Sequence, residues 1–264
     1  MMSSSGLATH NNLSTLASLL TNAQAASYRA LKRSKFRKQE GLFLLEGVRL
    51  CQEALHSDLE IIACITSKQF EKFPIPSNVK HFEATPVQIE QISDSKSPQG
   101  IICVARIPET PDEPNIKTTK ILLVLDRLSD PGNMGTIFRS ALWFGIHDIL
   151  LGPDCVDPYS PKVVRGSMGA IGTLNLHTST DLLSSAEEWK SAGGEVAALH
   201  MQGRALRTFK LDAPLFLIVG SEAHGVDQDL LKLSSPLAIE KPGSGESLNA
   251  AMATGIALFE LSKP

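Results

Sequence analysis

The sequence predicts an α/β protein in which a small N-terminal αβ domain precedes a larger domain with a mostly parallel sheet and helices on both faces. Two observations support this prediction. Beyond residue 120, short apolar runs alternate with segments of helical period, which is typical of parallel β-α-β units. Just before that point, residues 108–119 contain three prolines and no apolar periodicity, so we place a linker there. The predicted domains are residues 13–107 and residues 120–264.

The N-terminal domain is expected to combine short strands with helices. The first dozen or so residues are small and polar, and we expect them to be loosely ordered. Thr85 to Gln88 has the form of a capping box with proline at the first helical position, so a helix should begin there. Apolar runs place strands at 43–45, 61–66 and 101–105, and a helix at 48–55.

The C-terminal domain begins with a strand at 121–125 that leads through a polar turn into a helix at 132–144. One buried face of that helix is predicted by the spacing of Met134, Ile137, Phe138, Ala141 and Leu142. Further strands are expected at 148–151, 174–177, 195–200, 215–219 and 237–239. Further helices are expected at 161–166, where Ser160 is the predicted cap, at 181–190 and at 247–261. The last helix carries a stripe suited to close packing, within the fold or across a dimer, formed by Leu248, Ala251, Met252, Gly255, Ile256 and Phe259.

The amino-acid composition and the distribution of charge indicate which kinds of macromolecule the protein could bind. The chain has 264 residues, of which 42% are hydrophobic and 20% charged, with a formal net charge of -3, so it is globular and shows no bulk polyelectrolyte character. One local run is nevertheless strongly basic and has no intervening acid. A solvated helix face is one explanation for such a run, and contact with nucleic acid is the other. The run consists of Arg29, Lys32, Arg33, Lys35, Arg37 and Lys38.

Cysteine and histidine usage predicts neither a metal site nor a disulfide framework. The four cysteines are widely spaced and form no C-x-x-C pair, and the seven histidines show no ligand-like spacing. A reducing cytoplasm is the compartment we expect for such thiols. The N-terminus lacks a basic start followed by an apolar stretch, and no apolar run reaches the length of a membrane span, so we expect no secretory signal and no membrane partner.

Three loops that follow predicted strands are rich in glycine and polar residues, and parallel sheets bind ligands at the carboxyl ends of their strands. The first is the turn 130–133. The first backbone N–H groups of the helix that follows have no partner within the helix, so together with Asn133 and Arg139 they could bind an anion or a polar ligand. The alternative is a capped helix with an exposed arginine and no ligand. The second, 220–225, places Glu222 at a strand end, and the third, 240–249, leads into the last helix. For both loops, the alternative explanation is that glycine is present only because the chain turns there.

In order and spacing, these loops resemble the three sequence motifs of the SpoU/TrmH branch of the SPOUT RNA methyltransferases. The motifs correspond here to DPGNMGTIFRSALWFG, FLIVGSEAHGV and IEKPGSGESLNAAMATGIALFE, and the segment CVDPYSPKVVRGSMGA is similar to the family's connecting segment. The N-terminal stretches FLLEGVRLCQEAL and SPQGIICVARIP are similar to the family's small substrate-binding domain, which is related to a ribosomal RNA-binding protein fold.

This resemblance implies transfer of a methyl group from S-adenosylmethionine to a ribose 2'-hydroxyl, in ribosomal RNA by preference, with tRNA as the closest alternative. It also implies a homodimer and a deep trefoil knot, which strand alternation alone would not predict because true knots are nearly absent from proteins. The cofactor-contacting positions that it implies are Gly220, Ile239 and Leu248. The polar site residues that it implies are Asn133, Arg139, Glu222, Ser247 and Asn249.

The family proposal makes Arg139 the base that removes the hydroxyl proton, but a guanidinium is effectively always charged. We therefore expect Arg139 to hold the adjacent phosphate and to stabilise the developing oxyanion, while Asn133 and Asn249 orient the ribose. The chain departs from the family at Glu240 and Lys241, where an apolar pair is usual. Two other classes remain: a catalytically silent RNA-binding member of the fold, and an ordinary nucleotide-dependent α/β enzyme, against which the missing phosphate-loop motifs count.

Overall fold

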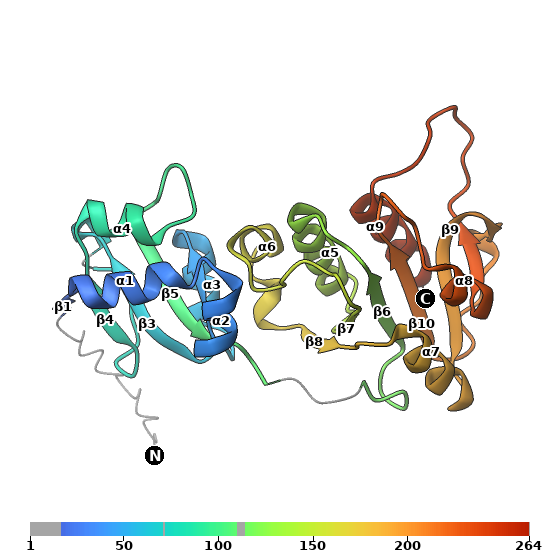
Figure 1. Ribbon diagram of the computed structural model, residues 1–264, viewed down its shortest axis with the longest axis horizontal. Helices are drawn as coiled ribbons and strands as arrows, with labels where there is room; N and C mark the ends of the chain where they lie inside the picture. The colour runs from blue at the N-terminus through green and yellow to red at the C-terminus, as the bar shows by residue number, and fades with distance from the viewer. Residues whose placement is uncertain (1–16, 71, 110–113, 264) are drawn as a thin grey trace, which may run out of the picture.

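The computed structural model describes residues 17–70, 72–109 and 114–263 (Figure 1). The N-terminal stretch that was expected to be loosely ordered, and residues 110–113 of the expected linker, lie outside the described residues. We name residues 17–109 the N-terminal unit and residues 114–263 the C-terminal unit. The domain limits set from the sequence stay a prediction.

The N-terminal unit is a mixed sheet with helices on both faces. Its elements are β1 (Ser18–Leu19), α1 (Asn22–Ala30), α2 (Ser34–Glu40), β2 (Leu42–Glu46), α3 (Val48–Leu55), β3 (Ile61–Thr66), the 3-10 turn η1 (Lys68–Phe70), β4 (Lys80–Glu83), α4 (Pro86–Ile92) and β5 (Ile101–Arg106). The strand order in the described residues is β1-β4-β3-β5-β2, with β3 parallel to β4 and antiparallel to β5. The predicted capping box of Thr85 and Gln88 is present at the start of α4.

The C-terminal unit is built on a sheet in which every strand pairing is parallel. Its elements are β6 (Ile121–Asp126), α5 (Pro131–Trp143), β7 (Asp148–Leu151), α6 (Pro161–Ser167), η2 (Ala170–Gly172), β8 (Asn175–Thr178), α7 (Leu182–Ser191), β9 (Glu195–Ala205), η3 (Leu206–Thr208), β10 (Leu215–Gly220), α8 (Gln228–Leu233), β11 (Ser235–Ala238) and α9 (Ala250–Leu261). The strand order in the described residues is β11-β9-β10-β6-β7-β8. This is the α/β architecture that the sequence predicts; the knot stays a prediction.

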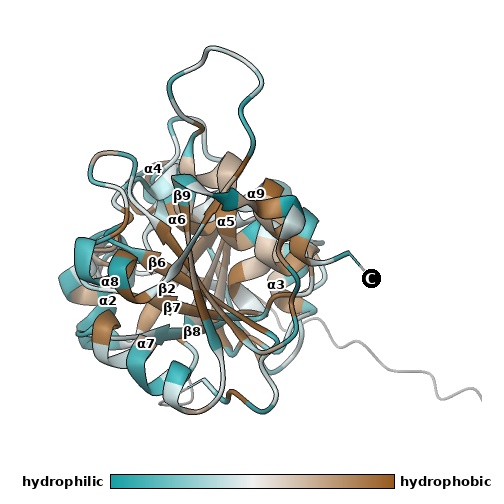
Figure 2. Cartoon of the chain, turned by 90° about the vertical axis from the view of Figure 1, so that its right-hand side faces the viewer, coloured by the Kyte–Doolittle hydropathy of each residue, from teal (hydrophilic) through white to brown (hydrophobic). Residues whose placement is uncertain are grey.

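Alternate residues of the central strands bury opposite faces of this sheet. On β6, Leu123 and Leu125 belong to the cluster that includes Met134 of α5, whereas Leu122 and Val124 belong to the cluster that includes Trp189 of α7. Figure 2 shows hydrophobic strands inside and hydrophilic outer surfaces on α7 and α8, whereas α9 also carries hydrophobic residues. Because both faces are covered, the carboxyl ends of the strands are where the sheet can present polar groups.

Three details of the helices differ from the sequence prediction. The last helix begins at Ala250 rather than at residue 247, since Asn249 caps it and the preceding loop stays extended. Its expected packing stripe is largely outside the core: Met252 is 60% exposed and Phe259 55%, while small and apolar residues on the other side of α9 are buried. The helix is apolar on nearly all sides, so its periodicity does not specify which face is buried. Ser160 occupies the cap position of α6, but its side chain makes no capping hydrogen bond.

Within the described residues, no helix is both long enough and apolar enough to cross a membrane.

Candidate active site

Side chains from the three glycine-rich loops meet in one hydrogen-bonded chain. Asn133, near the start of α5, donates from Nδ2 to Glu222 Oε1 in the loop after β10. Asn249, at the start of α9, donates from Nδ2 to Asn133 Oδ1 at 2.9 Å. The structure therefore brings together three polar residues that lie up to 116 positions apart in sequence.

Helix capping fixes the orientation of these amides. Asp130 is the N-cap of α5, and its Oδ1 accepts the Asn133 backbone N–H at 2.7 Å. Asn249 is the N-cap of α9, and its Oδ1 accepts the backbone N–H groups of Ala251 at 2.9 Å and Met252 at 3.2 Å. Because its oxygen is occupied by the helix start, its amide nitrogen is the group that faces Asn133.

A buried carboxylate that the sequence prediction does not include joins the end of β6 to the segment that follows the second loop. Asp126 ends β6 beside Gly220 of β10 and is 3% exposed. Its Oδ2 accepts the Asp227 backbone N–H at 2.8 Å, and its Oδ1 lies 3.0 Å from Arg127 Nε. The hydrogen bond to Asp126 raises the pKa of the Arg127 guanidinium. An acid that terminates an otherwise apolar strand is the sequence signal that identifies it.

Gly220 is required by the turn itself. A Cβ at this position would lie 2.2–2.4 Å from backbone atoms of Gly225 and Val226, where the second loop folds back to bridge Ser221 with Gly225. This geometry supports the alternative in which glycine here turns the chain. The backbone of Gly220 still ends β10 at the carboxyl edge of the sheet, beside the hydrogen-bonded chain described above.

The third loop, residues 240–249, is exposed along its length and rises away from the sheet in Figure 1. Ser247 is exposed and forms no hydrogen bond with the described residues, and Leu248 is 48% exposed. Ile239 is half-buried at the base of the loop. Glu240, one of the two residues that depart from the family pattern, pairs with Arg207 at 2.7 Å. Of this loop, only Asn249 contacts the polar chain.

Arg139 lies on the exposed side of α5, two turns after Asn133. Among the described residues it forms neither a hydrogen bond nor an ion pair, and it is not joined to Asn133 or Glu222. Its guanidinium, with its five donors, is therefore available to an anionic ligand.

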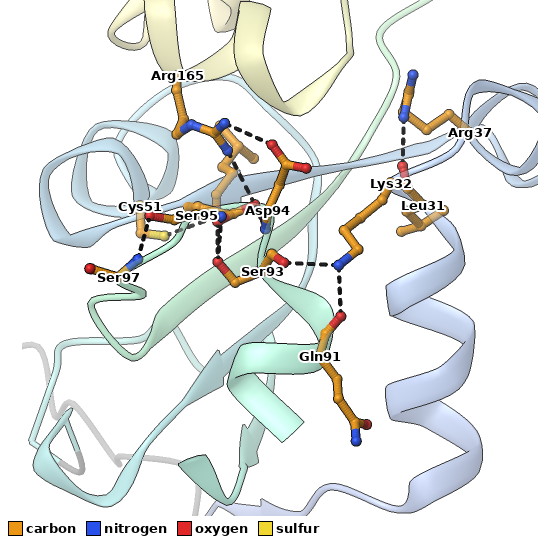
Figure 3. A network of polar contacts seen from close by, with 12 residues as sticks. Leu31, Lys32, Arg37, Cys51, Gln91, Ser93, Asp94, Ser95, Ser97 and Arg165 are labelled. Carbon is orange, nitrogen blue, oxygen red and sulfur yellow. Dashed lines mark hydrogen bonds and ion pairs between the residues drawn. The ribbon is translucent and has the colours of Figure 1, made fainter. Parts of the chain in front are cut away.

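The predicted basic run divides into two groups. Arg29, Arg33, Lys35 and Lys38 are exposed on α1, α2 and the turn between them. Lys32 and Arg37 are instead engaged by the protein (Figure 3): Lys32 Nζ donates to the carbonyl oxygens of Gln91 and Ser93 at 2.9 Å each, and Arg37 Nη1 donates to that of Leu31 at 2.7 Å.

Arg37 also binds the C-terminal unit, since its Nη2 lies 2.6 Å from Asp157 Oδ2, and the residue is only 3% exposed. It is therefore not available to RNA, contrary to the sequence prediction. Charge alone could not distinguish it from its exposed neighbours.

No group of three or more histidine, cysteine, aspartate or glutamate side chains in the part of the chain that the structure describes could hold a metal ion.

Comparison with known proteins extends this description. Residues 120–259 match the model of the SpoU rRNA Methylase family, and residues 22–103 match that of the MRM3-like substrate binding domain. An uncharacterized tRNA/rRNA methyltransferase of Synechocystis sp. is 32% identical over 90% of each chain. The 23S rRNA (guanosine(2553)-2'-O)-methyltransferase RlmP of Bacillus subtilis is 29% identical, covering 91% of this chain and 96% of RlmP. The crystal structure of AdoMet-bound rRNA methyltransferase from Sinorhizobium meliloti superposes with a TM-score of 0.77 at 28% identity, covering 92% of this chain and 95% of that one.

Proposed function

The chain belongs to the SpoU rRNA methylase family, and on that premise we propose that it transfers a methyl group from S-adenosylmethionine to a ribose 2'-hydroxyl of ribosomal RNA. The observation that carries the proposal is the hydrogen-bonded chain Glu222–Asn133–Asn249, because it joins the three motif loops at the carboxyl edge of the parallel sheet. The 2'-O reaction and the ribosomal substrate are supported by the name of RlmP. The cofactor is supported by the AdoMet-bound structure from Sinorhizobium meliloti.

The residues present fit this cofactor. Adenosine needs apolar surfaces for its rings and backbone groups for its polar edges. Leu248 offers an exposed apolar side chain and Ile239 a half-buried one, at the two ends of an open loop. A Cβ on Gly243 or Gly245 would meet nothing within 4 Å, so space remains beside the loop. Gly220, Ile239 and Leu248 would hold the cofactor, which supplies an electrophilic methyl group on a sulfonium.

The chain's own residues would orient and activate the ribose. The Nδ2 groups of Asn133 and Asn249 each retain a second N–H after their contacts with Glu222 Oε1 and Asn133 Oδ1. These donors can hold ribose oxygens. Oε2 of Glu222 has no hydrogen-bond partner among the described residues and can accept from a hydroxyl. Arg139 would bind the neighbouring phosphate and stabilise the oxygen as negative charge develops on it. We assign Ser247 to the same site, through the loop that carries it.

We further propose that the protein is a homodimer joined through α5 and α9. Trp143 is 83% exposed, Met252 60%, Phe259 55% and Ile256 37%, and the Phe144 and Phe259 rings, whose centroids lie 6.3 Å apart, hold the two helices together. An exposed apolar cluster of this kind is typical of a protein interface.

The dimer is tested by light scattering after gel filtration. Met252→Glu is expected to give monomers, because it places a charge in the interface. Met201→Glu is the matched control, since Met201 is 72% exposed and belongs to β9 rather than to α5 or α9, and it should leave the dimer intact. Wild-type protein that stays monomeric at high concentration would contradict the proposal.

The function is tested by incubating the protein with methyl-labelled S-adenosylmethionine and unmodified ribosomal RNA or tRNA. We expect label in ribosomal RNA, and a loss of label with Asn133→Ala that leaves cofactor binding measurable. Label in tRNA alone would favour the tRNA alternative. Cofactor binding without label in either RNA would favour the silent RNA-binding alternative. We retain the cytoplasm as the predicted compartment of the reaction.

A further inference from the structure

Two ion pairs that run in opposite directions join the N-terminal and C-terminal units. Arg37 of α2 reaches Asp157, with Nη2 2.6 Å and Nε 3.1 Å from Oδ2. Arg165 of α6 reaches back, with Nη2 2.8 Å from Asp94 Oδ2 and Nη1 3.6 Å from Glu46 Oε1 (Figure 3). Each unit thus contributes an arginine to a carboxylate of the other. Two separate points of attachment restrain rotation as well as separation, which a single contact would not.

Apolar residues also pack between the two units. Phe43 of β2 is fully buried against the Tyr159 ring, with centroids 5.0 Å apart. Burial, with a smaller contribution from Asp157, raises the pKa of Tyr159 to about 12. Val163 and Val164 of α6 are fully buried in the same cluster as Phe43. The units therefore share a core, and their relation does not depend on the proline-rich segment between them.

Helix α6 connects the interface between the two units to the candidate active site. In Figure 1 it lies between the N-terminal unit and α5. A Cβ on Gly135 of α5 would lie only 2.8 Å from Gly166 Cα, so the two helices touch backbone to backbone. Because α5 carries Asn133 and Arg139, any shift of the N-terminal unit on α6 reaches the residues proposed to act on the ribose.

Helix α2 carries both the attachment and the basic surface. Its inner side is docked, since Ser34 Oγ donates to Asp157 Oδ2 at 2.7 Å beside the Arg37 contact. On its outer side, Lys35 and Lys38 are exposed. The cations proposed to contact RNA are therefore fixed relative to the C-terminal unit by the helix that bears them.

We propose that Arg37 and Arg165 are positioning residues that hold the RNA-contacting surface of α2 at one separation from Asn133 and Arg139, and so determine which nucleotide of a bound RNA is methylated. This inference rests on the proposed function. The exposed surface of α2 would bind one part of the RNA. Because the distance between this surface and the candidate active site is fixed, only a ribose at the matching distance along the RNA would reach the site.

The first test measures the separation without any RNA. Spin labels are placed at Gln39→Cys on α2 and Glu187→Cys on α7, both exposed, in a Cys155→Ser background; the other three cysteines are buried. The labelled protein is diluted with unlabelled protein before assembly, so that the distances measured lie within one protomer of the proposed dimer. We expect a narrow distance distribution in the parent protein and a broad one in Arg165→Gln. Asp94→Asn is a milder second variant, because the Asp94 side chain is 42% exposed and its loss should not prevent folding.

The matched control is Arg106→Gln. Arg106 pairs with Glu60 at 2.6 Å, but both residues belong to the N-terminal unit and are at least half exposed. This control should keep the narrow distribution. A distribution in Arg165→Gln and Asp94→Asn as narrow as in the parent protein would overturn the proposal.

The second test reads the site of methylation on ribosomal RNA at nucleotide resolution. With Arg165→Gln, we expect kcat/KM at the normal nucleotide to fall about 100-fold, the loss typical of a small misplacement of reacting groups, while the Kd for S-adenosylmethionine is unchanged. Arg165→Lys should restore part of the rate. Unchanged rate and position would overturn the proposal. If the wild-type protein methylates no RNA, the proposed function fails, and the distance measurement still decides the arrangement of the units.

Discussion

The contact between α5 and α6 is predicted to depend on the absence of a side chain at Gly135. A Cβ there would lie 2.8 Å from Gly166 Cα, 2.8 Å from Val163 O and 2.9 Å from Gly166 C. All three are backbone atoms, which cannot rotate away as a side chain can. We therefore expect the added methyl group to cost the upper end of the range for overpacking a protein core, about 3 kcal/mol. Alanine recovers about 1 kcal/mol of helix propensity relative to glycine. Gly135→Ala should therefore destabilise the protein by about 2 kcal/mol, a decrease in Tm of roughly 4–8 °C for a chain of this size.

The assay is thermal unfolding at one protein concentration in the Met252→Glu background, which is expected to be monomeric, with Gly255→Ala as the matched control. Gly255 is also inside a helix, but a Cβ there would meet only Ser140 Oγ at 3.9 Å, an ordinary contact. Because alanine has the higher helix propensity, the control should be more stable than the parent protein by about 1 kcal/mol and should unfold at a temperature roughly 2–4 °C higher. Opposite signs for the two variants are expected. If Gly135→Ala were as stable as Gly255→Ala, the close approach of α5 to α6 would be refuted.

Three further predictions concern chemistry, RNA contact and acid stability. Arg139→Lys should lower kcat by about 100-fold and leave the pH–rate profile unchanged, as expected for a residue that stabilises charge; a shifted profile would favour the base role. Replacing Lys35 and Lys38 by glutamine should reduce the slope of log Kd for ribosomal RNA against log salt concentration by about 2, and an unchanged slope would remove α2 from the RNA-contacting surface. Burial raises the pKa of Asp148, but hydrogen bonds from an asparagine, a histidine and a threonine lower it below its ordinary value overall. The ionised carboxylate therefore stabilises the folded protein above the pKa of the unfolded state, and this stabilisation is lost as the pH falls through the pKa of the folded state. Asp148→Asn should lower the free energy of unfolding at pH 7 by about 2 kcal/mol. In denaturant titrations, the variant should also lose less stability than the parent protein as the pH is lowered towards 3.

The sequence predicts best the elements whose apolar run has clear limits. The helix at 48–55 and the strands at 61–66 and 148–151 have the predicted bounds, because apolar residues and flanking polar residues mark both of their ends. The pattern of residues does not predict β1, α1, α2, β4 or α8. The α2 sequence SKFRKQE contains one aromatic residue among polar ones, so it offers no period to detect. Its position is determined by tertiary contacts, above all those of Arg37.

For the candidate site, the sequence located the loops, and the structure shows how they are connected. Asn133, Glu222 and Asn249 were each identified, and their mutual hydrogen bonds follow from a parallel sheet that brings its strand ends to one edge. Asp126 and Arg165 were missed. Asp126 accepts the backbone N–H of Asp227, and Arg165 pairs with Asp94; both partners are far away in sequence, and residue type alone does not specify them.

The central claim, methylation of a ribose oxygen, is tested most directly by nucleoside analysis of ribosomal RNA after reaction with methyl-labelled S-adenosylmethionine. We predict that the label is recovered in a 2'-O-methylated nucleoside, and that the phosphodiester bond on its 3' side resists alkali because the methylated oxygen can no longer attack the phosphorus. Label recovered on a base, with every phosphodiester bond still cleaved by alkali, would contradict the account.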